Sequence, residues 1–216
     1  MSPRRPGAER WVPPRAGIDR LREAAETCEG CELFEDATQT VFGEGPDDAR
    51  LLCVGEQPGD DEDRSGRPFT GPSGRLLFKA FDQAGIDRST TYVTNAVKHF
   101  KFAQLQTGGR RIHKKPAAGE VAACRPWLLS ELNAVRPELV IALGATAAHS
   151  LLGREFRVSS QRGVIHDLAA DWLDEPTRIM ATVHPSAVLR LRDPEREEAF
   201  AQFIIDLRKA AEVLTG

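Results

Sequence analysis

The residues RLLCVGEQPG, numbered 50–59, join a short apolar run to a polar exit that is rich in glycine and proline. The run Leu51–Val54 carries no charge, which is typical of a strand buried on both faces of a parallel sheet. Such sheets bind ligands beyond the carboxyl ends of their strands. We therefore expect Gly55–Gly59 to be a binding loop. Cys53 lies inside the run, and its favoured interpretation is a small buried hydrophobe rather than a metal ligand.

Further apolar runs and amphipathic patterns alternate with this strand along the chain. Strands are predicted at 92–97, 139–144 and 178–183, and helices at 18–25, 75–81, 120–135, 145–152 and 195–214. Strands that alternate with helices are typical of helices packed on both faces of one sheet. The sequence thus predicts an α/β protein, a three-layer α/β/α sandwich with a mainly parallel central sheet.

The composition is ordinary for a globular protein: 216 residues, 41% hydrophobic, 28% charged, with a net charge of −3. We expect one domain over 18–216, preceded by a mobile lead-in over 1–17 that is rich in proline and glycine. The arginines of the lead-in are not followed by an apolar core, and no apolar run approaches the ~20 residues of a membrane span. We expect a cytoplasmic monomer with no membrane partner.

The stretch from Thr94 to Cys124 contains a loop that is long for a compact domain, and such loops are usually functional or disordered. Its cations predict a local phosphate-binding surface: Lys98, Lys101, Arg110, Arg111, Lys114 and Lys115. A solvated charged loop is an equally good interpretation of the charges alone. The acidic run 60–63 is interpreted as a solvated loop.

The cysteines outside the strand indicate metal or redox chemistry rather than structural disulfides. Cys28 and Cys31 form a CxxC pair, and Cys124 lies on the helix predicted at 120–135. A CxxC pair by itself fits a redox pair, half of a metal site, or chance.

Two segments, 66–74 and 184–186, carry polar or aromatic groups where chemistry is expected. The strand predicted at 178–183 ends in His184-Pro185-Ser186, a histidine and a hydroxyl on a stiff turn. Phe69 lies in the turn-rich segment 66–74, so an aromatic platform is at least as good an interpretation as core packing. Ser73 is expected to cap the helix that follows, whose amide end could hold a phosphate.

With these motifs in order, the chain resembles the iron–sulfur, family-four uracil-DNA glycosylases from Cys28 to the last helix. The resemblance rests on Cys28-x-x-Cys31, Gly55–Gly59, Asn95, Cys124 and His184-Pro185-Ser186. The loop Arg110–His113 and Gln57 narrow it to the UdgX branch, in which the enzyme becomes covalently trapped on the DNA that it has cut. The chain departs from the common family pattern at Lys98-His99, where a cysteine is expected, and at Gln57, where alanine is common.

The resemblance implies a role for each site residue on uracil-containing DNA. Phe69 would stack on the extruded uracil, Asn95 would bind its edge, and Gly55 and Gln57 would line the pocket. His184 would donate to the uracil oxygen, Glu56 would face the sugar, and His113 would be the nucleophile. The phosphate contacts would be Ser73, Ser186, Arg110, Arg111, Lys114 and Lys115.

The resemblance also implies a [4Fe–4S] cluster held by Cys28, Cys31, His99 and Cys124. Zinc bound by three cysteines and one histidine satisfies the same ligand count, so ligand chemistry alone leaves both open. Two rival functions remain open as well. One is a conventional family-four glycosylase that turns over repeatedly, and the other is a non-enzymatic iron–sulfur module that binds DNA.

Overall fold

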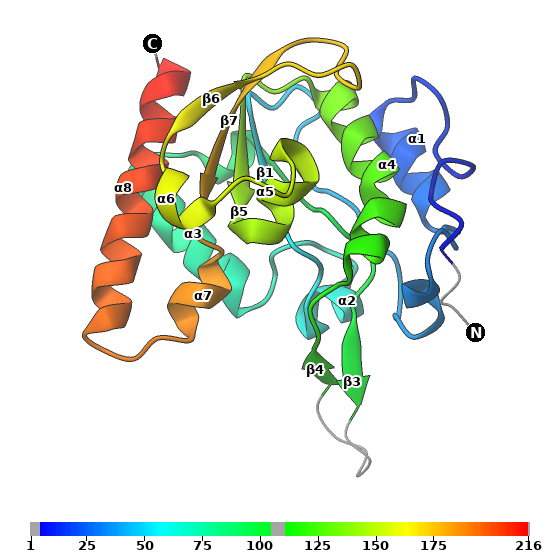
Figure 1. Cartoon of the computed structure of the whole chain (residues 1–216), viewed down its shortest axis with the longest axis horizontal. Helices are drawn as coiled ribbons and strands as arrows, with labels where there is room; N and C mark the ends of the chain where they lie inside the picture. The colour runs from blue at the N-terminus through cyan, green and yellow to red at the C-terminus, as the bar shows by residue number, and fades with distance from the viewer. Residues whose placement is uncertain (1–4, 105–110, 216) are drawn as a thin grey trace.

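A computed structural model of the chain describes residues 5–104 and 111–215. At its centre lies a five-stranded sheet in the order β2-β1-β5-β7-β6 (Figure 1). The strands are β1 (Leu51–Gly55), β2 (Thr91–Asn95), β5 (Leu139–Leu143), β6 (Ile165–Leu168) and β7 (Thr177–Thr182). All neighbours pair in parallel except the edge strand β6, which is antiparallel to β7. The four predicted strands are confirmed, whereas β6 was not foreseen.

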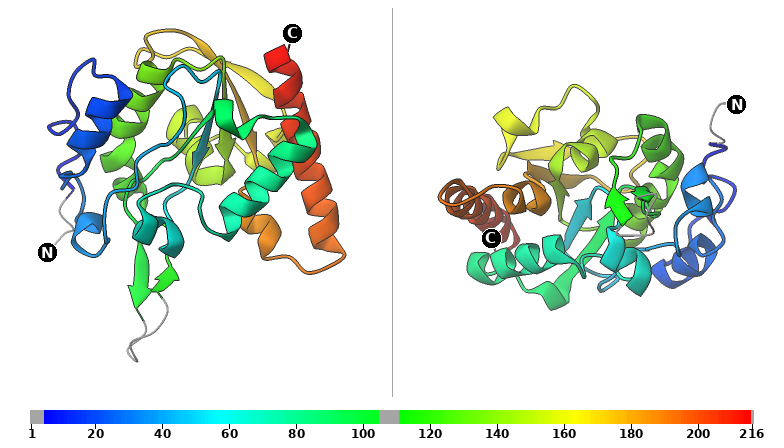
Figure 2. Two further views of the ribbon diagram at one scale, coloured as in Figure 1. Left: turned by 180° about the vertical axis from the view of Figure 1, so that it is seen from behind. Right: turned by 90° about the horizontal axis from the view of Figure 1, so that it is seen from below.

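Helices cover both faces of the sheet (Figures 1 and 2). One face packs on α1 (Ile18–Ala25), α4 (Ala118–Val135) and α5 (Gly144–Leu152), and the other on α3 (Pro72–Ala84) and α8 (Glu195–Thr215). Within β1, Leu52 and Val54 join the first core cluster, while Leu51 and Cys53 join the second. Because successive strand residues point to opposite faces, this division confirms the three-layer sandwich and the buried position of Cys53.

The described part of the lead-in, residues 5–17, is docked on the domain rather than separate from it. The Gly7 N–H donates to the Gly30 carbonyl (3.0 Å), and the Ala8 N–H donates to the Ala123 carbonyl (2.9 Å). Ala8 itself is buried. A Cβ at position 30 would lie 3.0 Å from the Ala8 backbone, so Gly30 permits this close approach.

The stretch expected to be one long loop contains a two-stranded sheet. β3 (Phe102–Gln104) pairs antiparallel with β4 (Arg111–His113), with Phe102 opposite His113. This β3–β4 hairpin projects beyond the edge of the main sheet at which β7 ends (Figure 1). Residues 105–110, which include the predicted phosphate contact Arg110, lie outside the described residues.

The acidic run expected in a solvated loop forms the short helix α2 (Asp60–Ser65). The Glu62 carboxylate accepts the backbone N–H groups of Gly59 (3.0 Å) and Gly71 (2.8 Å), which ties the two ends of this region together. Asp63 is fully buried. The prediction failed because carboxylates near a helix start bind free backbone N–H groups.

Short helices complete the chain: η1 (Glu32–Glu35), η2 (Arg88–Thr90), α6 (Val158–Gln161) and α7 (Pro185–Leu189). In the described ranges, no helix is long and apolar enough to cross a membrane.

Candidate active site

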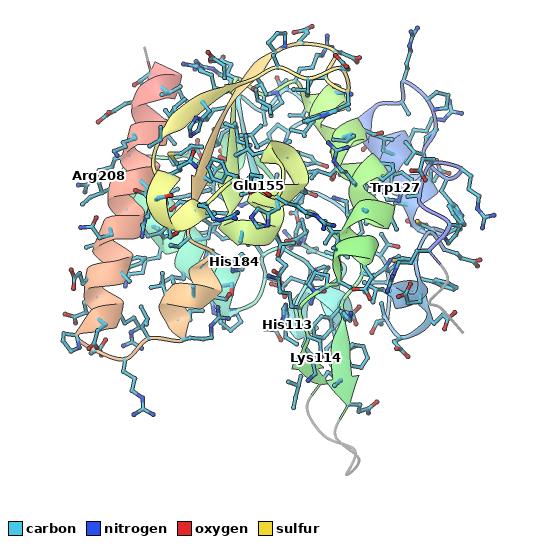
Figure 3. All side chains as sticks on the ribbon, viewed as in Figure 1. His113, Lys114, Trp127, Glu155, His184 and Arg208 are labelled. Atoms are coloured by element: carbon cyan, nitrogen blue, oxygen red, sulfur yellow. The ribbon has the colours of Figure 1, made fainter. Side chains whose placement is uncertain are left out.

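A cavity of about 830 Å³ opens at the carboxyl ends of the parallel strands. Its lining includes residues that lie far apart in the sequence: Glu56, Phe69, Asn95, His113, Thr146 and His184. Figure 3 labels His184 at the start of α7 and His113 on the β3–β4 hairpin. The parallel arrangement produces this gathering, because successive parallel strands deliver their loops to one edge.

Asn95 and Phe69 line the cavity, and Gly55, which was expected to line it as well, lies against both of them without being part of the lining. Gly55 and Asn95 are register partners at the ends of β1 and β2. A Cβ at Gly55 would lie 2.3 Å from Asn95 Oδ1 and 2.8 Å from Phe69 Cζ, so only glycine fits between them. Phe69 has a φ of +58°, which is costly for a bulky residue and is typical of functional sites. The ring packs on the second core cluster and also lines the cavity.

His184 is held by its own turn. Its Nδ1 accepts the backbone N–H of Ser186 (3.1 Å), and Ser186 Oγ lies 2.9 Å from the same nitrogen. A nitrogen that accepts a backbone N–H carries no proton, so the neutral ring bears its proton on Nε2. Burial lowers the pKa of His184 to about 4, and the neighbouring His113 and Arg190 lower it further. Near pH 7 the ring is therefore neutral and has one donor, Nε2–H.

His113 lies on β4, and its side chain is 49% exposed. Gln57 reaches it from the loop after β1. The Gln57 Oε1 accepts the Lys101 N–H (3.2 Å), while its Nε2 donates to the carbonyls of Lys101 (3.2 Å) and Lys114 (3.0 Å). These contacts fix the orientation of the amide, whose Nε2 lies 2.9 Å from His113 Nε2. An amide nitrogen only donates, so its two protons are shared among the two carbonyls and His113 Nε2, and that ring nitrogen is an acceptor with a lone pair.

Burial lowers the pKa of His113, while the nearby Glu56 carboxylate opposes this shift. Glu56 Oε1 lies 3.8 Å from His113 Nε2. The other carboxylate oxygen, Oε2, accepts a hydrogen bond from Thr146 Oγ1 (2.5 Å). A neutral imidazole and a carboxylate thus meet at the mouth of the cavity.

Arg111 was predicted to bind phosphate, but its guanidinium is turned toward protein carboxylates. It pairs with Asp60 and with Asp63 Oδ2 (2.6 Å), and it lies over the rings of Phe100 and Phe102. The side chain is 12% exposed. Arg111 therefore anchors the β3–β4 hairpin to α2. The sequence prediction did not foresee this because it placed the acidic run in solvent.

Two other cations of the predicted basic surface are also paired. Lys98 is 1% exposed and forms an ion pair with Glu131, which is fully buried, and Lys101 pairs with Glu120 (2.8 Å). Lys98 Nζ also donates to the Asn95 carbonyl (2.8 Å), so it supports the strand end that carries Asn95. The available sequence signal was the glutamates of the helix predicted at 120–135. The sequence alone does not show which lysine each of them faces.

Lys114 and Lys115 remain exposed, and Lys115 lines the cavity. Arg190, which the sequence analysis did not select, lines the cavity from the end of α7. Its position one turn beyond His184-Pro185-Ser186 was the signal that could have found it.

The two serines expected to contact phosphate both line the cavity, but the prediction that Ser73 caps a helix was wrong. Helix α3 begins at Pro72 and its N-cap is Gly71, so Ser73 lies within the first turn and is not the cap. Proline suits the first helical position because its missing N–H would have no partner there. Ser186 Oγ contacts His184 Nδ1, so its hydroxyl supports the histidine.

Three buried thiols, Cys28, Cys31 and Cys124, lie near one another. Trp127 Nε1 donates to Cys28 Sγ (3.2 Å), and the Lys98 N–H donates to Cys124 Sγ (3.2 Å). Burial raises the pKa of Cys31 to about 11 and that of Cys124 to about 12, and the charges of neighbouring thiols add to both shifts. Thiolates gathered here would need a bound cation. N–H donors to sulfur are a feature of iron–sulfur sites.

His99 has the chemistry of a ligand nitrogen. Thr40 Oγ1 donates to the Ala25 carbonyl (2.9 Å), so at its 2.9 Å contact with His99 Nε2 it accepts, and the His99 proton is on Nε2. Burial lowers the pKa of His99 to about 4, so the ring is neutral and Nδ1 has the lone pair. A hydrogen bond that fixes the tautomer is typical of histidine ligands.

Among the described residues, no group of three or more His, Cys, Asp or Glu side chains surrounds a point where a single metal ion could sit. Buried thiols with one neutral imidazole are a donor set that suits an iron–sulfur cluster, and they suit zinc as well.

Comparison with known proteins agrees with this architecture. Residues 42–208 match the model of the uracil DNA glycosylase superfamily. The type-4 uracil-DNA glycosylase of Thermotoga maritima is 36% identical over 179 residues, covering 82% of this chain and 86% of the relative. The type-4 uracil-DNA glycosylase of Archaeoglobus fulgidus is 32% identical over 190 residues, covering 86% of this chain and 89% of the relative. The chain belongs to the uracil DNA glycosylase superfamily.

Proposed function

We propose that this protein excises uracil from DNA and then remains covalently bound to the abasic site through His113, as a member of the UdgX branch. The observation that carries the proposal is the cavity that gathers Asn95, Phe69 and His184 with Glu56 and His113. The names of the type-4 relatives support the substrate class.

Uracil must leave the base stack before its glycosidic bond can be reached, and this costs a few kcal/mol. Phe69 offers a ring for stacking, and its strained backbone is held by the surrounding turn. The Asn95 amide binds the uracil edge, and Gly55 leaves room beside it. The substrate is uracil-containing DNA, with the base held in the part of the cavity that Phe69 and Asn95 line.

Cleavage of the bond between C1′ and the base leaves the electron pair on uracil and positive charge on the sugar. His184 donates its Nε2–H to the uracil oxygen and stabilises the departing anion. A neutral donor suits this role, and the low pKa of His184 keeps the ring neutral over the physiological range. The Glu56 carboxylate stabilises the positive sugar.

His113 then forms a bond from its ring nitrogen to C1′. Its lowered pKa keeps a lone pair available at neutral pH, and Glu56, 3.8 Å away, stabilises the charge that the ring gains. Once the alkylated imidazole is neutral, it is a poor leaving group. Water therefore does not displace it from C1′, and each protein molecule turns over once.

Exposed cations attract the DNA backbone. Lys115 and Arg190 line the cavity, and Lys114 is exposed directly after the β3–β4 hairpin. Their contacts would be salt-dependent and independent of base sequence.

A [4Fe–4S] cluster would be held by Cys28, Cys31, Cys124 and His99. When bound, it supplies a structural cross-link between the N-terminal segment, α4 and the segment that leads into the hairpin. The His99→Cys variant should keep iron and visible absorbance, because thiolate is the usual ligand. The His99→Ala variant should lose iron or hold it weakly. Iron loss in a Cys53→Ala variant with none in His99→Ala would show that the ligand set is wrong.

The full chain should be incubated with a uracil-containing oligonucleotide, and with a thymine-containing strand of the same sequence as the control. The products should be run on a denaturing gel, and free uracil should be quantified. The wild-type protein should release about one uracil per molecule and shift to a denaturation-resistant adduct. The His113→Ser variant should release uracil repeatedly without forming the adduct.

Each rival gives a different result. Repeated uracil release by the wild type without an adduct would indicate a conventional glycosylase. A uracil strand that stays as intact as the thymine strand would indicate a non-enzymatic module. An adduct whose modified peptide lacks His113 would overturn the assignment of the nucleophile.

A further inference from the structure

Thr146 lies on the first turn of α5 and lines the cavity, although no motif of the sequence analysis includes it. It is 8% exposed. Its hydroxyl donates to Glu56 Oε2 over 2.5 Å. A hydrogen bond to a charged acceptor is stronger than one between neutral groups, so this contact restrains the carboxylate.

The chain reaches this position by a tight turn between β5 and α5. Gly144 has a φ of +83°, a conformation that favours glycine. A Cβ at this position would lie 2.9 Å from His184 Cβ. Because β5 pairs directly with both β1 and β7, the turn comes between the loop that carries Glu56 and the turn that carries His184.

The contact leaves the two carboxylate oxygens with different partners. Oε2 is bound to Thr146, while Oε1 is the oxygen that lies 3.8 Å from His113 Nε2. Rotation of the carboxylate away from His113 would break the bond to Thr146. We propose that Thr146 is a positioning residue that holds Glu56 oriented toward His113 and the sugar. This proposal rests on the proposed function, in which Glu56 stabilises the positive sugar.

If the Thr146 hydroxyl only supported its own helix, it would bond to a backbone carbonyl rather than to Glu56. Threonine and serine hydroxyls inside helices often bond to a preceding carbonyl. Ser150 in the same helix does so, since its Oγ donates to the Ala147 carbonyl (2.7 Å). Ser150 is also buried to a similar degree. It therefore offers a matched control whose hydroxyl is bound to the backbone rather than to Glu56.

The test uses the full chain with protein in excess over a uracil-containing oligonucleotide, so that one turnover is observed. Thr146→Val removes the hydroxyl at nearly constant volume, and Thr146→Ser retains it. We expect Thr146→Val to slow uracil release and adduct formation by about tenfold or more. Thr146→Ser and the control Ser150→Ala should stay within about threefold of the wild-type rate. All three variants should bind the thymine-containing strand with unchanged affinity, because the proposal gives Thr146 no contact with the phosphates.

A double-mutant cycle separates action through Glu56 from a general loss of packing. In a Glu56→Gln background, Thr146→Val should cause little further loss of rate. Equal losses in Thr146→Val and Thr146→Ser, a wild-type rate in Thr146→Val, or full additivity with Glu56→Gln would each overturn the proposal. If Thr146→Val does not fold, Thr146→Ala provides the same comparison, because alanine favours helices.

Failure of the proposed function would look different. If the wild type releases no uracil, the proposed function fails, and the role of Thr146 fails with it. If the wild type releases uracil without forming an adduct, only trapping fails, and the rate of uracil release still tests Thr146.

Discussion

The two histidines of the cavity are held in opposite ways. His184 is oriented by Ser186, two residues further along the chain, and by the tight packing of Gly144 against its Cβ. His113 depends on remote side chains: Gln57, 56 residues away, contacts its ring, and Arg111 ties its strand to Asp63, 48 residues away. One histidine belongs to a local turn, whereas the other belongs to a hairpin attached by long-range contacts.

This difference suits the two proposed roles. A group that stabilises a departing anion must be in place before the bond breaks, because preorganised donors cost no rearrangement during the reaction. A group that attacks the sugar after the base has left must approach a position that the substrate occupied. A hairpin attached by side chains can supply that approach more readily than a strand end in the sheet.

The largest effect is expected at the locally held histidine. The His184→Ala variant should lower the rate of uracil release by about 10²–10³, as when other enzymes lose a donor to an anionic intermediate. The His113→Ser variant should retain uracil release and lose only the adduct. Measuring free uracil and the adduct in both variants tests the division of roles. Similar losses of uracil release in the two variants would show that the roles are not separate.

The next effect concerns the attachment of the hairpin. Arg111→Met should leave Asp63 buried without its cation, which destabilises the fold by about 3 kcal/mol. The thermal midpoint should fall by about 10 °C, and adduct yield should fall more than uracil release. Lys114→Met on the same hairpin is the control, because Lys114 is exposed. If Arg111 instead bound phosphate, the variant would keep its stability and lose DNA affinity.

A smaller effect concerns acid sensitivity. The pKa of His184 is lowered to about 4 in the folded protein, against an ordinary value of 6.5. Below pH 6.5 His184 therefore binds a proton in the unfolded chain, whereas in the folded protein it stays unprotonated down to about pH 4. Acid thus favours unfolding. The free energy of unfolding should fall by about 2 kcal/mol more in the wild type than in His184→Gln between pH 6.5 and 4, after allowance for water in the cavity. Equal pH dependence in denaturant titrations of the two proteins would contradict the lowered pKa.

The smallest effect is expected from the exposed cations. Lys114→Ala and Lys115→Ala should each reduce the salt dependence of DNA binding by about one phosphate contact, with only a modest loss of affinity. Binding to the thymine-containing strand at several salt concentrations measures this slope. Lys101→Ala, which removes a cation already paired with Glu120, should leave the slope unchanged.

Much of the fold could be predicted from runs of adjacent residues. The runs at 51–54 and 139–143 lack charges, and the structure buries both as neighbouring strands of the sheet. The edge strand β6 was missed because it is only partly buried and includes His166 and Asp167, so its pattern has no continuous apolar run. The β3–β4 hairpin was missed because its strands have three residues each.

In the candidate site too, some features could be predicted from adjacent residues, whereas others depend on distant partners. The sequence by itself determined that Glu56 and His184 leave strand ends, because each comes just after an apolar run and parallel strands end at one edge. The structure placed Asn95 at the end of β2, where the sequence had predicted a strand that continues to residue 97. Only the tertiary structure decided that Arg111 and Lys98 bind carboxylates, that Gln57 contacts His113 and that Thr146 contacts Glu56. The reason is physical: a strand is encoded by its own residues, whereas the partner of a charge or a hydroxyl depends on which distant side chain the packing brings within hydrogen-bonding distance.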